Sequence, residues 1–525
     1  MLSKRLSTNI STFSKVITEN CIYVDKTEQI YHLFKEKSQY YFLSRPRRFG
    51  KSLLISTLEE LFKGNKELFK GLWIYSSNFE WQEHPIIHLD FLNIPHSDPD
   101  MLKQALVRAL VKIAADYGFP KIEQASPEEA LKCLAEKLAT KNSIVLLIDE
   151  YDKPILDHLH NIEIAEKQRT VLKGFYEAVK SLDRYWHAVF ITGVSRFSKT
   201  SIFSGFNNLN DISEKTVSVN LLGYTHAEIE HYFSEYIDLF AQEKKLTSQF
   251  LFDEMKTWYD GYRFCGDLSK EPVFNPFSVL YYLQDQKRAN YWFNSGTPSF
   301  LVELLKQNPY ELSDINNIFV TPADLGTVDI NNINRIVLFY QTGYLTIKDF
   351  LVQGSSELFM LGYPNQEVAL SVTAHLTSIL ANIDKAKVDS TIFFIKKALI
   401  DNDITLFCKS LKTLWANIPY SMHIAREAYY HSLLQNMCNL LGIDVQSEVL
   451  TSNGRLDLVI ATKNRIFIFE LKFKEAANIA LQQIFDKRYY EKYLLKGKPI
   501  TLVGLSFDFK DKKLDLEWES QEYKG

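Results

Sequence analysis

Residues 1–222 alternate short, continuous apolar runs with longer amphipathic stretches. The runs have strand length and lack a period-two alternation, which is typical of strands buried on both faces. The longer stretches carry apolar residues at helical spacing. Buried strands alternating with helices predict an α/β domain built on a parallel sheet. The expected strands lie in 39–46, 85–94, 143–152 and 187–196, and the expected helices are 52–64, 101–118 and 165–182.

The pattern changes at about Gly223. Two helical stretches, 225–240 and 248–264, lead into a region rich in aromatic residues, with Gly261 near a helix end and a small β element around 344–350. We therefore expect a mainly helical middle domain over 223–369.

The remaining part, 370–525, begins with helical patterns over 370–414 and at 424–442. Three runs with strand character and a last helix follow. This order predicts a compact C-terminal α/β domain, after a first domain over 1–222. The expected strands are 445–450, 454–462 and 465–473, and the last helix is 476–495.

Bulk composition fits a chain of several domains. At 525 residues, 46% hydrophobic and 24% charged, the sequence is of ordinary globular type and of a length that predicts two to four domains. The formal net charge is -4, so any contact with nucleic acid must come from a local basic patch.

The compartment expected for the chain is the cytoplasm. No apolar run is long enough to span a membrane, and the N-terminal residues are not followed by the apolar segment of a secretory signal. The cysteines have no zinc-like spacing, and buried thiols in a reducing compartment are the expectation. They are Cys21, Cys133, Cys265, Cys408 and Cys438.

A basic segment, SRPRRFGKS at 44–52, separates a predicted strand from a predicted helix. In a phosphate-binding loop the backbone N–H groups of such a turn face phosphate oxygens, Lys51 reaches the outer phosphates and Ser52 binds Mg²⁺. Arg45 stands at the position where the motif usually has its first glycine. Because arginine has a side chain, the backbone at this position adopts positive φ less readily than it would with glycine. The alternative is a basic loop that caps the start of a helix and does not bind a nucleotide. The expected nucleotide-binding residues are Arg48, Phe49, Gly50, Lys51, Ser52 and Asp149.

A second motif supports the nucleotide interpretation. The apolar strand 144–150, IVLLIDE, ends in two carboxylates, of which Asp149 would join the Mg²⁺ shell and Glu150 would polarise the attacking water. The alternative is a buried strand ending in two solvated acids. The strand at 187–196 ends with polar residues suited to sense the γ-phosphate, although such residues are normal at strand ends. They are Thr192, Ser195 and Arg196.

A different set of charged residues occurs near the C-terminus. Glu470 and Lys472 lie two apart on a predicted strand and so share a face, while Asp457 lies in the preceding apolar strand. Two carboxylates from neighbouring strands can bind Mg²⁺ or Mn²⁺, with Glu427 completing the shell from a helix. Lys472 would position water or stabilise charge on a phosphate. The alternative is a half-exposed hairpin, but ionised acids inside apolar strands are costly unless paired or metal-bound.

The first region resembles the bacterial AAA-ATPase-like family of predicted ATPases. The resemblance rests on YVDKT at 23–27 and on the segments 43–54, 146–155 and 190–204. It implies a P-loop NTPase-like parallel sheet and ATP as ligand. It also implies that Asp25 and Lys26 lie near the nucleotide.

The C-terminal set resembles the PD-(D/E)XK nuclease superfamily over about 425–493, and implies a restriction-endonuclease-like α/β domain. The family's helix acid maps to Glu427, its aspartate to Asp457, and its E-x-K to Glu470 and Lys472. Gln482 falls at a supporting glutamine position. Leu456 replaces the motif's proline, and Glu448 is a further candidate ligand.

Together these features predict an ATP-binding protein with slow hydrolysis, fused to a metal-dependent nuclease acting on DNA or RNA. The catalytic residues would be Glu150, Asp457, Glu470 and Lys472, and the metal ligands Ser52, Asp149, Glu427, Asp457 and Glu470. One alternative is a nucleotide-dependent switch or scaffold whose nuclease-like domain does not cut, and another is a binding protein without either activity. The expected partners are a nucleotide and nucleic acid, with no membrane, and the sequence leaves oligomerisation open. Residues that could contact nucleic-acid phosphates are Lys472, Lys474, Lys487, Arg488 and Lys492.

Overall fold

The computed structural model describes residues 3–35, 38–119, 126–197, 202–203, 208–296, 318–326, 328–329, 334–353, 356–381, 385–415, 434, 444–451, 454–510 and 513–523. Two compact units make up the chain: Met1–Leu304 with Asn316–Glu367, and Val368–Gly525 with Leu305–Ile315. The domain boundary expected at 222/223 falls inside the first unit and stays a prediction, as does the boundary at 369/370.

The first unit is built on a parallel sheet of five strands in the order β2-β3-β4-β1-β5. The predicted α/β class with a parallel sheet is therefore confirmed. Because all strands run the same way, the loop after β1 and the acids that end β2 and β3 lie at one edge. The strands are β1 (Tyr40–Ser44), β2 (Ile86–Asp90), β3 (Ile144–Asp149), β4 (Trp186–Gly193) and β5 (Asn210–Asp211).

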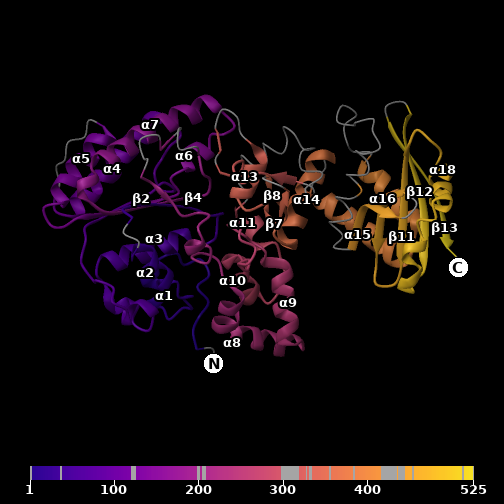
Figure 1. The fold of residues 1–525 in the computed structure, drawn as a ribbon, viewed down its shortest axis with the longest axis horizontal. Helices are drawn as coiled ribbons and strands as arrows, with labels where there is room; N and C mark the ends of the chain where they lie inside the picture. The colour runs from indigo at the N-terminus through magenta and orange to yellow at the C-terminus, as the bar shows by residue number, and fades with distance from the viewer. Residues whose placement is uncertain are drawn as a thin grey trace. The chain divides into compact units, whose positions relative to one another are not determined.

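Helices cover both faces of this sheet (Figure 1). One group includes the helix that follows the predicted phosphate loop, and its apolar side joins a buried cluster with the sheet. The other group is started by capping residues, such as Asp98, whose side chain accepts the N–H of Met101. The first group is α1 (Phe13–Thr18), α2 (Thr27–Lys35) and α3 (Lys51–Phe62), and the second is α4 (Pro99–Asp116), α5 (Pro127–Leu138), α6 (Lys153–Leu156) and α7 (Ile162–Ser181).

The middle region of the first unit is mainly helical, with a small antiparallel sheet in the order β6-β8-β7. Helix α9 ends at Tyr259, just before Gly261, whose φ is +95°. A Cβ at Gly261 would lie 2.1 Å from the carbonyl oxygen of Pro364, so this close approach needs glycine. The elements are α8 (His226–Lys244), α9 (Ser248–Tyr259), α10 (Pro276–Asp285), α11 (Tyr291–Gly296), α13 (Arg335–Gln341), β6 (Ile318–Val320), β7 (Thr346–Gln353) and β8 (Ser356–Gly362).

The second unit contains a mixed sheet in the order β13-β12-β11-β10-β9, in which only β11 and β12 are parallel among the described strands. Sequence analysis missed β12 and β13, and its last helix is shorter than expected, since α18 ends at Asp486 and a 3-10 helix (Glu491–Lys496) follows. The predicted helix 424–442 lies outside the described residues except at 434. The elements are α14 (Gln366–Ala381), α15 (Lys385–Asp401), α16 (Ile404–Trp415), β9 (Asp444–Thr451), β10 (Gly454–Ala461), β11 (Ile466–Phe473), α18 (Ala477–Asp486), β12 (Ile500–Lys510) and β13 (Lys513–Tyr523).

The side chains on the two faces of β11 pack in two different buried clusters. Phe467, Phe469 and Leu471 join a buried cluster with α15 and α16, whereas Ile466 and Ile468 pack in another cluster with α18. Side chains alternate along a strand, so the next residues on the α18 face are positions 470 and 472.

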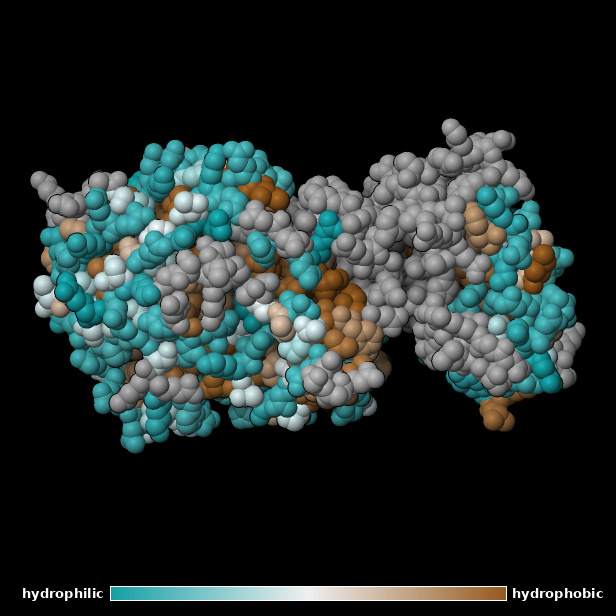
Figure 2. Space-filling model, turned by 45° about the horizontal axis from the view of Figure 1, so that its top comes forward, coloured by the Kyte–Doolittle hydropathy of each residue, from teal (hydrophilic) through white to brown (hydrophobic). Residues whose placement is uncertain are grey.

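The visible face of the first unit is mostly hydrophilic, with isolated apolar atoms and one apolar patch toward the centre of the picture (Figure 2). Its large apolar side chains are mainly buried. Within the described part of the chain, no helix has both the length and the apolar character needed to cross a membrane.

Candidate nucleotide and metal sites

A cavity of about 430 Å³ lies at the edge of the parallel sheet where the strands end. One end of the cavity is formed by the predicted phosphate loop, together with Asp90, Glu150 and Lys153. The rest is largely apolar, with walls from the N-terminal segment, the turn before α8 and helix α10. The loop residues that line it are Arg47, Arg48, Phe49, Gly50, Lys51 and Ser52.

The loop has the backbone shape that a turn into a helix requires. Gly50, at φ +94°, precedes the first residue of α3, and Arg48 also has a positive φ, of +64°. The residues after Gly50 begin a 12-residue helix, whose first N–H groups have no partner within the helix. Such a helix start favours an anion.

Lys51 is buried and is one of the residues that line the cavity. Its Nζ donates to the backbone carbonyls of Arg45 and Pro46, at 3.0 and 3.1 Å, and lies 3.4 Å from Oε1 of Glu150. Ser52 is exposed and lines the cavity. The structure therefore brings Lys51, Ser52 and Glu150 together.

Three carboxylates meet where β2 and β3 end. Asp90 and Asp149 are paired in the sheet register, and Glu150 follows with a φ of +55°. Burial raises the pKa of Asp90, and the nearby charges of Asp149 and Glu150 raise it further. Asp149 accepts a hydrogen bond from Oγ1 of Thr192 at 2.5 Å and does not line the cavity. Sequence analysis missed Asp90, although it ends an apolar strand as Asp149 does.

Ser195 joins β4 to the acidic turn after β3 rather than facing the cavity. Its N–H and its hydroxyl both donate to Oδ2 of Asp152, each at 2.6 Å. Asp152 is fully buried, which raises its pKa to about 6. This contact holds the turn that carries Glu150.

Arg45 is buried away from the cavity and holds the loop from behind. Its guanidinium donates to the carbonyls of Ser213 and Ser218, at 2.7 and 2.9 Å, and stacks over the ring of Phe264. Burial lowers its pKa to about 10. The φ of Arg45 is not positive, so its side chain causes no backbone strain of the kind expected where an arginine replaces glycine.

Arg196 is also engaged elsewhere. Its guanidinium forms an ion pair with Glu214 and donates to the carbonyl of Leu325 at 2.9 Å. Burial lowers the pKa of this group but the charge of Glu214 outweighs it, so the net shift is upward. Arg196 does not line the cavity.

Of the two residues that the family resemblance placed near the nucleotide, only Lys26 lines the cavity. Its Nζ lies 2.6 Å from Oε1 of Glu228. Asp25 instead accepts hydrogen bonds from the N–H groups of Thr27 and Trp73, at 2.8 and 2.7 Å. Its role is structural in this arrangement.

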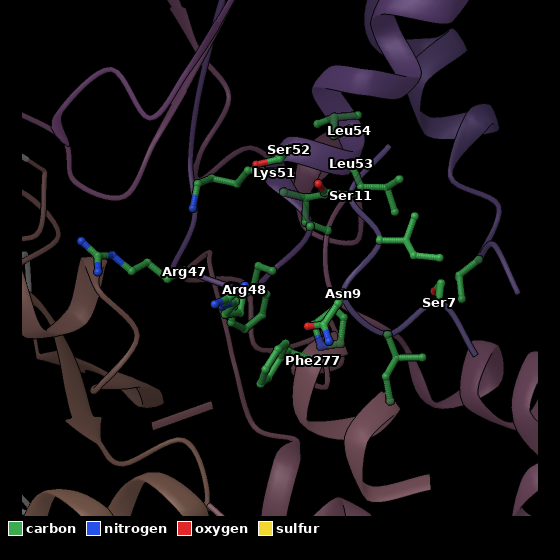
Figure 3. Close-up of a pocket in the computed structure, with 18 of the residues that line it drawn as sticks. Ser7, Asn9, Ser11, Arg47, Arg48, Lys51, Ser52, Leu53, Leu54 and Phe277 are labelled. Atoms are coloured by element: carbon green, nitrogen blue, oxygen red, sulfur yellow. The ribbon is translucent and has the colours of Figure 1, made fainter. Parts of the chain in front are cut away.

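Residues distant in sequence form the opposite wall. The guanidinium of Arg48 lies 5.0 Å from the ring centre of Phe277 on α10. Asn9 accepts a hydrogen bond from the hydroxyl of Tyr281 at 2.7 Å. Figure 3 shows Arg48, Asn9 and Phe277 close together, with Lys51 and Ser52 farther along the loop.

In the second unit, Asp457 and Glu470 lie on the same face of the sheet. The register pairs Leu458 with Phe469, so Asp457 and Glu470 are the next facing positions, and Asp457 accepts the N–H of Leu471 at 2.7 Å. Glu470 is 2% exposed, and its Oε1 lies 3.5 Å from Nζ of Lys472. The structure thus brings these three predicted residues together on the face covered by α18.

A glutamine reaches Glu470, but it is Gln483 rather than the predicted Gln482. The amide of Gln483 donates to Oε1 of Glu470, while Gln482 is exposed and bonds to Asp486 at 2.8 Å. Adjacent helix residues differ by about 100° in direction, so only one of two neighbours can face the sheet. The prediction for Gln482 is wrong for this reason.

Tyr489 lies near Glu470, Gln483 and Lys472, and the sequence did not predict it as part of this site. Burial raises its pKa, the charges of Glu470 and Asp457 add to the rise, and Gln483 and Lys472 oppose it. A tyrosine six residues after a glutamine has no strong sequence signal.

Helix α18 lies very close to the sheet here. A Cβ at Gly504, which pairs with Glu470 in register, would lie 2.3 Å from the carbonyl oxygen of Ala477 and 2.5 Å from the N atom of Leu481. Glycine at this position therefore allows the approach that brings Gln483 to Glu470.

The third predicted acid, Glu427, and the side chains of Glu448 and Leu456 lie outside the described residues. Among the residues that are described, no group of three or more histidine, cysteine, aspartate or glutamate side chains comes together as a metal site. Asp457 and Glu470 form the described part of the predicted metal site.

Comparison with known proteins agrees with the two family resemblances. The family model described as "Predicted AAA-ATPase" matches residues 7–203, and the "PD-(D/E)XK nuclease superfamily" model matches residues 425–517. An uncharacterized protein in the vnfD 5′ region of Azotobacter chroococcum mcd 1 is 35% identical over 518 residues, which cover 97% of each chain.

Proposed function

Because the chain belongs to the family of predicted AAA-ATPases that carry a C-terminal PD-(D/E)XK nuclease superfamily region, we propose that it binds ATP with Mg²⁺ and cuts nucleic acid with its second unit. The observation that carries the nucleotide proposal is the convergence of Lys51, Ser52 and Glu150 on one cavity. The proposed catalytic residues of the second unit are Asp457, Glu470 and Lys472.

The residues of the cavity fit a nucleoside triphosphate with magnesium. The start of α3 and Lys51 offer N–H donors and positive charge to phosphate oxygens, and the apolar walls suit a base. Ser52 lines the cavity and offers an oxygen ligand of the kind that Mg²⁺ prefers, and Mg²⁺ would neutralise charge on the phosphates. Asp149, which accepts a hydrogen bond from Thr192 and does not line the cavity, stays a proposed second ligand. Glu150 would orient the attacking water and accept its proton.

We propose that hydrolysis is slow. Arg196, which the sequence suggested as a sensor of the γ-phosphate, pairs with Glu214 and does not line the cavity, so it is not placed to act as an arginine finger there. Loss of an arginine finger typically costs on the order of a thousandfold in rate. Arg45 holds the loop from outside the cavity and so gives no separate support for slow hydrolysis.

The residues of the second unit fit one side of a divalent-metal site. Asp457 and Glu470 supply hard oxygen ligands, and Mg²⁺ or Mn²⁺ would polarise a phosphodiester and its attacking water. Lys472 would stabilise charge on the phosphate, and Gln483 would hold Glu470 in position. Glu427 stays a proposed third ligand.

The substrate would be DNA or RNA, and we infer a cytoplasmic location. The described cysteines, free of disulfide bonds, suit a reducing compartment.

The decisive experiment is a cleavage assay with purified full-length protein on single- and double-stranded DNA and RNA, with Mg²⁺ or Mn²⁺ and with or without ATP. We expect metal-dependent cleavage that Asp457→Asn abolishes. Nucleotide binding without cleavage under any of these conditions would favour a nucleotide-dependent switch or scaffold instead.

A further inference from the structure

The phosphate loop is held from its outer side by residues of the middle region. The indole Nε1 of Trp292 donates a hydrogen bond to the backbone carbonyl of Arg47 at 2.9 Å. Pro46 packs against Gly343, where an added Cβ would lie 2.7 Å from the proline ring. The two carbonyls that precede that of Arg47 along the chain belong to Arg45 and Pro46. These two carbonyls accept hydrogen bonds from Lys51. Trp292 and Lys51 therefore act on one short stretch of backbone.

Trp292 also contacts a buried acid at the start of α14. Its backbone N–H donates to Oε1 of Glu367 at 2.6 Å, and the hydroxyl of Ser278 donates to Oε2 at 2.7 Å. Glu367 is 0% exposed. A buried carboxyl held by several donors has one preferred position, because losing a partner would leave a polar atom unsatisfied.

The segment just before α14 is fixed to the same region. The amide of Asn365 donates to the carbonyl of Asp260 at 2.8 Å, next to the close approach of Gly261 and Pro364. Helix α14 then continues without a break from Glu367, the last residue of the first unit, into Val368, the first long stretch of the second. The helix is thus covalently part of both units.

We propose that Trp292 is a positioning residue for the phosphate loop and that Glu367 transmits the state of the loop to α14, so that nucleotide binding and the second unit influence each other. This inference rests on the proposed nucleotide site and adds its regulation. Phosphates that attract Lys51 would release the carbonyls of Arg45 and Pro46 and change the loop that Trp292 holds. Coupling of this kind is reciprocal, so a ligand of the second unit would also change nucleotide affinity.

Hydrogen exchange of the full chain tests the proposal, with and without a non-hydrolysable ATP analogue and Mg²⁺. In the wild type we expect bound nucleotide to slow exchange in peptides from 366–381. Trp292→Phe keeps an aromatic ring but removes the N–H donor. It should weaken nucleotide binding about fivefold, and at saturating nucleotide the response of α14 should be lost. Trp258→Phe, the same change on α9, should leave both unchanged.

A second variant keeps the test informative should Trp292→Phe fail to fold. Ser278→Ala removes one donor to Glu367 without touching the loop, so nucleotide affinity should stay within about twofold and the α14 response should shrink. A wild type that binds no nucleotide would overturn the proposed nucleotide site itself. Tight binding with unchanged exchange over 366–381, or an undiminished response in both variants, would overturn the inference alone.

Discussion

Nζ of Lys51 lies 3.4 Å from Oε1 of Glu150, so the cation of the phosphate loop already forms an ion pair with the acid that follows β3. The side chain of Lys51 is buried and that of Glu150 is 18% exposed, and Lys51 also donates to two loop carbonyls. A nucleotide at the proposed site would therefore compete with Glu150 and the loop backbone for Lys51.

Lys51→Ala should weaken binding of MgATP by about 1.5–3 kcal/mol, or roughly 10- to 100-fold, because it removes charge-assisted hydrogen bonds to the outer phosphates. Isothermal titration calorimetry measures this directly. Lys63→Ala, just after the C-terminal end of α3 and paired with Glu59 outside the cavity, should bind as the wild type does. Equal affinity in wild type and Lys51→Ala would contradict the proposed role.

Glu150→Gln should separate binding from hydrolysis. The amide removes the negative charge that competes for Lys51, so MgATP affinity should be equal to or greater than that of the wild type. Release of phosphate should fall by at least about a hundredfold, since the proposed general base is lost. A phosphate-release assay reports the rate, with the exposed Glu163→Gln as control. Undiminished turnover in Glu150→Gln would exclude this residue as the base.

Asp457→Asn should abolish stabilisation of the second unit by metal. A metal that binds only the folded state raises its melting temperature in proportion to the logarithm of the metal concentration. Calorimetric scans of the full chain with increasing Mg²⁺ or Mn²⁺ should show this for the wild type and for Asp401→Asn, at the exposed end of α15. A wild-type melting profile indifferent to both metals would refute the proposed site.

Glu367 should give the first unit a pH-dependent stability. Burial raises the pKa of its carboxyl from 4.5 to about 8, against the opposing hydrogen bonds of Ser278 and Trp292. Because the folded state holds the proton more tightly, its contribution is complete below pH 4.5 and is lost as the pH rises through about 8.

Glu367→Gln tests this assignment, because a neutral amide of the same shape does not titrate. The melting temperature of the first unit, measured from pH 5 to pH 9, should fall less steeply in Glu367→Gln than in the wild type. Identical slopes would show that the carboxyl is not the titrating group.

Gly504→Ala should displace α18 from the sheet, because its Cβ would lie 2.3 Å from the backbone of Ala477. Overpacking of this kind costs about 1–3 kcal/mol, and Gln483 would lose its contact with Glu470. Urea denaturation measures the cost. Gly497→Ala has open space around its Cβ and a φ of +63°, so it reports the backbone strain alone.

The sequence predicted most of the parallel sheet because long apolar runs leave few alternatives for strands such as β3. The same signal was present in β12, whose run ITLVGLSF follows the last helix, and in the alternating residues of β13, but both were overlooked. The choice between Gln482 and Gln483 is different in kind. It depends on the rotation of α18, which the close approach at Gly504 fixes through contacts far apart in the sequence.

Arg45 shows a second limit of sequence reasoning. Its position in the motif suggested a strained substitute for glycine, yet its partners are the carbonyls of Ser213 and Ser218. No local pattern links 45 to residues so distant along the chain. The partners of Arg196, Glu214 and Leu325, were hidden for the same reason.

The alternation along β11 has a consequence for substitutions at the proposed site. Phe467, Phe469 and Leu471 anchor one layer, while Glu470 and Lys472 face the other side. Substitution of the charged pair would leave the apolar contacts on the opposite face in place, so the proposed cutting activity and the fold of the domain would be separable. A chain with the same apolar set but without the charged pair would keep the domain as a folded module without the proposed metal site.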